Sequence, residues 1–276
     1  MRIDAHQHYW TIDRGDYGWI TPELPVLYRD FLPHDLEPLL NKHYLDGSVM
    51  IQAAPTIEET NYILSLADKS SSVLGVIGWL DLFQPDHRKH YESFHQHPKF
   101  KGFRIMIQDM PDAARILEPA FVEALRGYAA EGVPVDLLLT SQQMGPVLEL
   151  FRQVPDLRGV IDHLAKPPIH SGELEPWSHY LADMSAFPRI CCKLSGMVTE
   201  ADPNGWKKDD FVSYIRRVLE LFGPHRVMFG SDWPVCLLAA DYDEVMDLLL
   251  HALPESWGER ERERLFGENA KEFYKL

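Results

Sequence analysis

The chain has 276 residues, of which 45% are hydrophobic and 25% are charged, and its formal net charge is −15 at pH 7. This length suits one domain with a single large core, and the composition excludes a disordered or fibrous chain. The negative charge disfavours nucleic acid and anionic membrane surfaces as partners, because long-range repulsion opposes their approach. We therefore predict one domain over residues 1–276 that binds neither nucleic acid nor membranes.

The sequence contains no recognisable export or membrane segment. Its first residues lack the apolar core of a signal peptide, and no apolar run approaches the roughly 18 residues of a membrane span. The three cysteines have no spacing typical of a disulfide framework or a zinc ribbon. We expect a cytoplasmic protein with reduced thiols, and the sequence leaves its oligomeric state open, a homodimer included.

Eight short apolar runs, rich in Val, Ile, Leu and Phe, predict strands covered on both faces, as in a parallel sheet. In chain order they lie at residues 2–6, 47–53, 73–80, 100–107, 133–139, 158–163, 189–195 and 226–231. Helical periodicity separates them at 57–69, 112–131, 141–153, 208–222 and 241–252, with weaker patterns at 86–97 and 172–186. These units predict an α/β fold of the (β/α)8 TIM-barrel type, whose active sites lie at the carboxyl ends of the strands.

Two segments depart from this repeat. Residues 9–34 are rich in aromatics and prolines without a clean period, which predicts a long first loop. Its Tyr9-Trp10 pair and Trp19 either form a lid over the barrel mouth or pack the loop down. Residues 258–275 are charged and helical, and we expect them on the outside of the barrel or across its bottom.

Two histidines close the first predicted strand. His6 and His8 are two residues apart, so their side chains point to the same side of the strand and can share one ligand. In a TIM barrel they would face the mouth. The alternative is a pair of ordinary surface or core histidines.

Two more polar residues follow later strands. His163 leaves the sixth apolar run shortly before Pro167, and Asp232 directly follows the eighth. A carboxylate in an aromatic-lined mouth should pair with a protonated histidine, a metal or a water molecule, because leaving it unpaired is costly. The alternatives are a hydrogen-bonded structural role for His163 and a helix N-cap for Asp232.

Together these motifs resemble the amidohydrolase superfamily: His6-x-His8, Asp162-His163-Leu164-Ala165-Lys166-Pro167 and Gly230-Ser231-Asp232-Trp233-Pro234. With Lys-Gly-Phe-Arg at 101–104 and Lys-Leu-Ser-Gly at 193–196, the chain is similar to the amidohydrolase-related branch that contains sugar lactonases of the L-fuconolactonase and L-rhamnonolactonase type. The resemblance covers nearly the whole chain. It implies a TIM-barrel hydrolase that opens a sugar-derived lactone.

The motifs depart from the binuclear members of that superfamily. Those enzymes carry a lysine on strand four and a histidine on strand five, where this chain has Arg104 and the histidine-free run 135–140. We therefore expect at most one divalent cation, with zinc the first choice, held by His6, His8 and Asp232, with or without His163. The resemblance to lactonases that need no metal leaves open that no cofactor is obligatory.

Ester hydrolysis needs a base for water and a donor for the oxyanion. We assign Asp232 as the base and His163 as the donor to the carbonyl oxygen or the leaving alkoxide. Predicted substrate-binding residues share a place near a strand end: Gln52, Trp79, Arg104, Gln108, Asp136, Lys193 and Trp233, with Ser195 nearby. Arg104 has an ion pair inside the barrel as its alternative, and Lys166 is either a cationic aid or a solvated loop residue.

Two other functions remain open from the sequence. One is a mononuclear metal-dependent decarboxylase or hydratase of the same superfamily. The other is a sugar-acid binding protein in which the histidines and Asp232 only hydrogen-bond a ligand.

Overall fold

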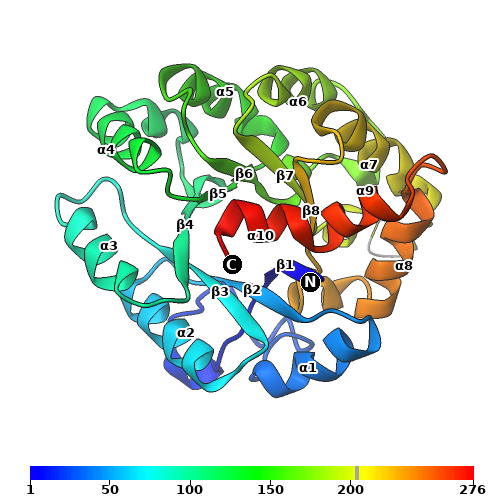
Figure 1. Cartoon of the computed structure of the whole chain (residues 1–276), viewed down its shortest axis with the longest axis horizontal. Coiled ribbons are helices and arrows are strands. Elements are labelled where there is room, and N and C mark those ends of the chain that lie inside the picture. The colour runs from blue at the N-terminus through cyan, green and yellow to red at the C-terminus, as the bar shows by residue number, and fades with distance from the viewer. Residues whose placement is uncertain (203–204) are drawn as a thin grey trace.

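The structure, a computed structural model, describes residues 1–202 and 205–276. Eight parallel strands form one sheet in chain order, and Figure 1 looks down the resulting barrel. The strands are β1 (Ile3–Gln7), β2 (Gly47–Ile51), β3 (Val73–Trp79), β4 (Phe100–Met106), β5 (Val135–Leu138), β6 (Gly159–Ile161), β7 (Ile190–Leu194) and β8 (Val227–Phe229). Residues following β8 close the barrel on β1, because the His8 amide donates to Trp233 O and the Asp232 amide to His6 O, both at 2.8 Å. The predicted (β/α)8 TIM barrel is confirmed.

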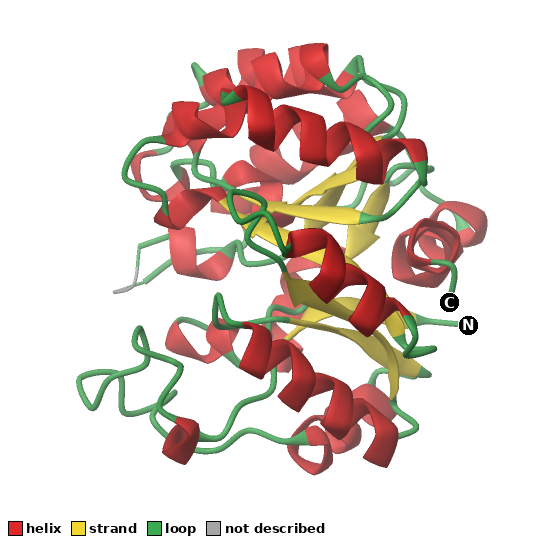
Figure 2. Ribbon diagram, turned by 90° about the vertical axis from the view of Figure 1, so that its left-hand side faces the viewer, coloured by secondary structure: helices red, strands yellow, loops and turns green. Residues whose placement is uncertain are grey.

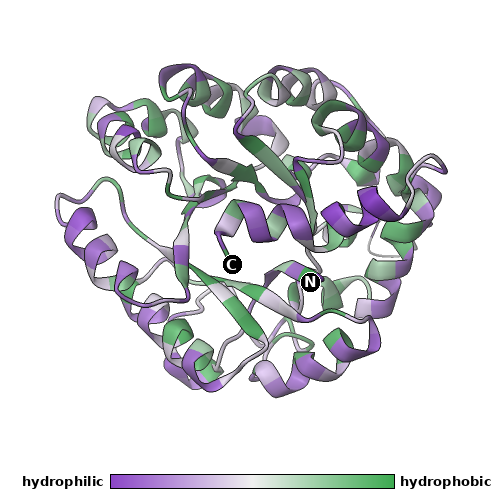
Figure 3. Cartoon of the chain, in the orientation of Figure 1, coloured by the Kyte–Doolittle hydropathy of each residue, from purple (hydrophilic) through white to green (hydrophobic). Residues whose placement is uncertain are grey.

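Helices surround the barrel. They are α1 (Pro33–Lys42), α2 (Ile57–Lys69), α3 (His87–His95), α4 (Pro119–Ala130), α5 (Met144–Gln153), α6 (Trp177–Ser185), α7 (Asp209–Phe222) and α8 (Tyr242–Ala252). Short 3-10 turns lie at Ile12–Arg14, Ile107–Asp109, Ala113–Leu117, Ser141–Gln143, Asp162–Ala165, Ile169–Ser171, Val198–Glu200 and Val235–Leu238. Figure 3 shows hydrophobic residues on the strands and on the helix faces turned toward them. Among the described residues, no helix is both long and apolar enough to cross a membrane.

Local sequence explains where several helices begin. The Thr56 side chain accepts the Glu59 amide at 3.0 Å and so caps α2. The predicted helix 112–131 divides at Glu118, which has φ −58° and ψ 135°, because a residue before proline avoids helical geometry. Helix α1 was not predicted: its two prolines obscured the period, although proline in the first turn is a start signal.

The C-terminal segment covers the amino end of the barrel. Of the two expected placements, this is the one across the bottom of the barrel. It comprises α9 (Glu259–Glu263), a π-helical turn (Arg264–Glu268) and α10 (Asn269–Tyr274). The Asn269 side-chain amide donates to Val227 O at the start of β8, at 2.7 Å. Figure 1 shows α10 lying across the barrel, and Figure 2 shows both termini at one end with long loops at the other.

The barrel interior is layered. Its lowest layer is a hydrophobic cluster of strand residues and residues of α10. The strands contribute Ile3, Ala5, Val49, Ile51, Ile77, Val160 and Met228, and α10 contributes Ala270, Phe273 and Tyr274. A charged layer lies above it, and the cavity opens above that. Filled layers of this kind are typical of TIM barrels and leave the carboxyl end of the strands for chemistry.

Candidate active site

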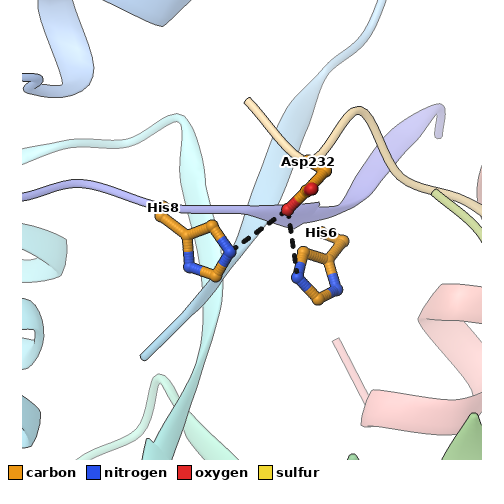
Figure 4. Close-up of side chains that lie close together, drawn as sticks. All are labelled: His6, His8 and Asp232. Atoms are coloured by element: carbon orange, nitrogen blue, oxygen red, sulfur yellow. Dashed lines mark ion pairs between the residues drawn. The ribbon is translucent and has the colours of Figure 1, made fainter. Parts of the chain in front are cut away.

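Four side chains meet at the carboxyl ends of β1, β6 and β8. Oδ1 of Asp232 lies 3.3 Å from Nε2 of His8, 3.7 Å from Nε2 of His6 and 3.9 Å from Nε2 of His163. All four residues are buried. Figure 4 shows His6 and His8 directed at this carboxylate oxygen. The structure thus brings together the four residues that the sequence assigned to the centre.

A register shift in β1 points the histidines inward. The pairing of β1 with β2 slips between Asp4 and Gln7. Asp4 faces outward, where it accepts from Tyr242 OH of α8 at 3.0 Å, and Gln7 also faces outward, donating to Ser48 Oγ at 3.0 Å. In a regular strand, residues three apart lie on opposite faces, so the irregularity is what allows both to face out while His6 reaches the interior.

The backbone after β8 is shaped to present Asp232. This residue has φ 57°, in the left-handed region that few non-glycine residues adopt. Two residues earlier, a Cβ on Gly230 would lie 2.5 Å from Cβ of His6. Glycine is therefore required there for the eighth strand to approach the first so closely.

The segment after β6 has a more unusual backbone. His163, Leu164, Ala165 and Lys166 all have positive φ, at 53°, 55°, 59° and 47°. Left-handed geometry costs roughly 1–2 kcal/mol for each such residue, so surrounding contacts must hold the turn. The Trp177 indole supplies one of these by donating to Leu164 O at 2.7 Å. The turn brings both His163 and Lys166 to the cavity.

Strand β7 supports His163 from the side. Nδ1 of His163 lies 2.8 Å from Ser195 Oγ. The next residue, Gly196, has φ +57°, and a Cβ there would lie 2.4 Å from the His163 ring. When Ser195 donates to Nδ1, the proton of the neutral imidazole resides on Nε2, the nitrogen that faces Asp232.

Burial and neighbours set opposite protonation states for the central pair. Burial lowers the pKa of His163 to about 4, even though Asp232 favours its charged form. Burial alone would raise the pKa of Asp232, but contacts with His163, His8 and His6 hold it below its usual range. At neutral pH the site therefore contains an ionised carboxylate beside an uncharged imidazole.

A cavity of about 330 Å³ opens at these residues. Its walls combine polar and apolar side chains, namely His8, Trp19, Ala53, Arg104, Met106, Gln108, Asp109, Leu138, His163, Lys166, Thr199, Asp232 and Val235. That size and mixed lining suit a small polar molecule with some hydrocarbon surface.

A fully buried charge cluster lies beneath the cavity. Lys193 forms an ion pair with Asp136, and its Nζ lies 3.0 Å from Oδ1 of Asp162 and 3.1 Å from Nδ1 of His6. Tyr274 of α10 donates to Asp136 from below at 2.9 Å. Burial and the Lys193 ammonium hold the pKa of His6 well below its ordinary value. The cluster thus links the bottom of the barrel to a histidine of the site.

The structure separates the predicted substrate-binding residues into groups. Gln108 lines the cavity, whereas Asp136 and Lys193 belong to the buried cluster and do not. Trp79 lines a different pocket, beside Leu80 and Phe121. Trp233 is 3% exposed and packs edge-to-face on Phe31 at 5.2 Å.

Arg104 and Gln52 act on each other. The Arg104 guanidinium donates to the Gln52 backbone oxygen and, at 2.7 Å, to its side-chain oxygen, and lies 3.5 Å from Asp162. This arrangement includes the ion pair that the sequence left as the alternative for Arg104. Arg104 still lines the cavity, whereas Gln52 is wholly buried and orients it.

Sequence reasoning did not single out Asp162 as a site residue. Its carboxylate contacts His6 Nδ1 at 3.3 Å as well as Lys193 and Arg104. The sequence feature that could have identified it is its position at the end of an apolar run, directly before His163.

The residues at the centre fit one metal ion. Ligand atoms of His6, His8 and Asp232 lie within 4.8 Å of one another, and those of His6, Asp162 and His163 form a second such group. Nε2 of His6 is buried and has no hydrogen-bond partner among the residues that the structure describes. Nδ1 of His8 donates to Ile51 O at 2.8 Å, so Nε2, which faces Asp232, is the ring nitrogen available to a cation. Imidazole and carboxylate ligands suit a divalent cation, and a nitrogen without a hydrogen-bond partner is free to bind one.

Comparison with known proteins agrees with this geometry. A family model described as Amidohydrolase (Amidohydro_2) matches residues 3–276. The chain belongs to the amidohydrolase family. This amidohydrolase is 40% identical to L-fucono-1,5-lactonase of Burkholderia ambifaria, over 100% of its own length and 96% of that protein. It is 36% identical to L-fucono-1,5-lactonase of Burkholderia multivorans, with the same coverage.

A solved structure is also closely similar. It is an amidohydrolase from Burkholderia multivorans with bound zinc, which matches this amidohydrolase with a TM-score of 0.95 and 35% identity, over 100% of this chain and 99% of that one. The predicted family resemblance and hydrolase class are therefore confirmed.

Proposed function

We propose that this amidohydrolase opens the ring ester of a sugar-derived lactone, with L-fucono-1,5-lactone the first substrate to test. The full-length identity to two proteins of that name supports the substrate class. The observation that carries the reaction is the ionised Asp232 facing the neutral His163 at 3.9 Å across one cavity. The decarboxylase or hydratase alternative has less support, because these relatives are named lactonases.

In the proposed reaction, a water molecule attacks the ring carbonyl carbon and gives its proton to Asp232. All three histidine contacts of Asp232 involve Oδ1, so we assign Oδ2 to the water proton. Nε2–H of His163 donates to the developing oxyanion. The carbon–oxygen bond of the ring then breaks. The leaving alkoxide takes a proton from the Asp232–His163 pair, and the product is a hydroxy acid.

We propose zinc as the divalent cation, held by His6, His8 and Asp232. The imidazole donors and the unpartnered Nε2 of His6 support this choice, as does zinc in the similar solved structure. When bound, zinc supplies Lewis-acid chemistry at the carbonyl. His163 remains a fourth candidate ligand. We further propose a cytoplasmic location, with a homodimer still open.

We propose that Gln108 and Arg104 bind the substrate directly and that Gln52 contributes by orienting Arg104. Asp136 and Lys193 would act from beneath by positioning His6, and Trp233 by packing behind Asp232. Trp79 has the weakest support among the proposed binding residues, because it lines a separate pocket.

A pH-indicator assay with a panel of 1,4- and 1,5-aldonolactones tests the function. We expect acid release from at least one 1,5-lactone and its loss in Asp232→Asn. Parallel assays after chelator dialysis and zinc addition report the metal requirement, with bound zinc measured by elemental analysis. If the zinc-loaded protein hydrolysed none of the lactones, the proposal would be overturned.

A further inference from the structure

The first loop is closed on itself at its base. Trp10 and Phe31 exchange two backbone hydrogen bonds, at 3.0 and 2.9 Å. The Trp10 indole turns into the loop and donates to Arg29 O at 2.9 Å and to Leu27 O at 3.3 Å. The Trp10 ring therefore fills the loop and holds the loop backbone through these hydrogen bonds.

Trp19 is fixed where this loop meets the cavity. Its indole nitrogen donates to Ala53 O at 2.9 Å, and its ring packs edge-to-face on Trp10 at 5.6 Å. The residue that accepts this bond is itself held, because the Ala53 amide donates to Oε1 of the fully buried Glu59 at 3.0 Å. Arg104 donates to the Gln52 carbonyl, which belongs to the same peptide as that amide. These contacts favour a fixed wall over a lid that opens and closes.

The indole ring is nevertheless uncovered. Trp19 is 40% exposed as a residue and lines the cavity, and the one polar atom of its side chain is already bonded. Among the described residues lining the cavity it is the only Phe, Tyr or Trp side chain. The same cavity is lined by His163 and Asp232, so this ring and the proposed reacting groups border one space.

We propose that Trp19 is a specificity-determining residue whose indole stacks on the C–H face of a closed lactone ring. The inference rests on the proposed function and adds how the ring is selected. A lactone ring is rigid and offers one continuous C–H face, whereas the hydroxy-acid product is an open, flexible chain. A prearranged aromatic wall binds the rigid lactone ring with little loss of entropy. It binds the flexible hydroxy acid poorly.

Steady-state kinetics of Trp19→Ala and Trp19→Phe provide the test. For the best lactone we expect Trp19→Ala to raise KM roughly tenfold, with kcat within about twofold of the parent value. Inhibition by the hydroxy acid should change much less than KM. Trp19→Phe lacks the Ala53 hydrogen bond but keeps a ring, so its KM should lie between the two.

Trp206→Ala is the matched control. Its indole also donates to a backbone oxygen, Ala239 O at 2.9 Å, but it does not line this cavity. Its KM should equal that of the parent. A purely structural role of Trp19 predicts instead that kcat and thermal stability fall while KM rises. An unchanged KM in Trp19→Ala, or equal losses for lactone and acid, would overturn the inference.

Calorimetric binding of an aldono-1,5-lactam, a ring that water does not open, separates this inference from the proposed function. If no lactone is hydrolysed but the parent binds the lactam and Trp19→Ala binds it roughly tenfold more weakly, the function fails and the ring-stacking role stands. Equal lactam binding by both proteins refutes the stacking role whatever the activity.

Discussion

Asp232 illustrates how one residue is defined by its surroundings. It lies within 4 Å of three histidines, and its left-handed backbone turns it into the cavity. These contacts favour the carboxylate form, which is the form that can accept a proton from water. The histidine cluster thus both creates the base and leaves it little freedom to move.

Replacing Asp232 by Asn should lower kcat/KM by about 10²–10⁴-fold, the usual contribution of a general base. The amide is similar in size but cannot accept the water proton. Asp109→Asn serves as the control, because Asp109 lines the same cavity yet is exposed and makes no contact with the histidines in the structure. Equal activities of the two variants in the lactone assay would contradict the assigned base.

Glu59 gives a prediction about pH. Burial raises its pKa to about 8 from 4.5, and its Oε2 has no hydrogen-bond partner within residues 1–202 and 205–276. The folded state therefore holds a proton that the unfolded state releases, so this residue's contribution to stability is present below pH 4.5 and is lost as pH rises to about 8.

Glu59→Gln removes that titration. Its stability relative to the parent should increase between pH 5 and 8, by up to about 1.4 kcal/mol per pH unit, in urea unfolding at several pH values. Glu58→Gln, at the exposed neighbouring position, should show no such trend. A pH-independent difference for Glu59→Gln would show that Glu59 is not protonated in the folded protein.

At the scale of elements, the ends of β6 and β7 are built around each other. The left-handed turn presents His163, and Gly196 leaves room for its ring. Neither works alone, because the ring would collide with any side chain at 196. The two strand ends form one unit for positioning the proposed oxyanion donor.

Gly196→Ala should displace the His163 ring and reduce kcat/KM roughly 100-fold. Gly132→Ala is the matched control, because Gly132 also has positive φ, at 64°, but a Cβ there meets nothing within 4 Å. Both changes should cost stability, by about 1 kcal/mol from the backbone strain alone. Full lactone hydrolysis by Gly196→Ala would argue against the assigned role of His163.

The elements differ in how far sequence could predict them. The apolar runs located all eight strands, since strands covered on both faces have a simple pattern. His6 and His8 were correctly placed together by spacing, but the register shift beneath them leaves no local mark. Asp136 and Lys193 were expected at the mouth because they lie near strand ends. Each residue along a strand adds only about 3.3 Å, so depth in the barrel depends on register, which sequence does not reveal.

At the scale of the whole molecule, α10 does more than close the barrel. Tyr274 donates to Asp136, which pairs with Lys193, which in turn contacts His6. No local pattern could have joined residues 138 positions apart. The buried charges beneath the site are therefore completed by a side chain from the C-terminal helix.

Tyr274→Phe should lower the free energy of unfolding by about 1.5–3 kcal/mol, since a buried hydrogen bond to a charged group is lost. Tyr44→Phe, at a side chain that is 81% exposed, should change it by less than about 0.5 kcal/mol. Thermal and urea unfolding measure both. If the two variants were equally stable, Tyr274 would have no part in the charge cluster.

The contact between Tyr274 and Asp136 also bears on how the protein is made. A ribosome delivers β1 before β8 and β8 before α10, and the barrel cannot close on β1 until the residues after β8 have emerged. His6 therefore emerges long before Asp232, and both Asp136 and Lys193 emerge before Tyr274, whose hydroxyl completes the hydrogen bonds of Asp136. The candidate active site and the charge cluster beneath it can therefore be completed only after both ends of the barrel have been synthesised.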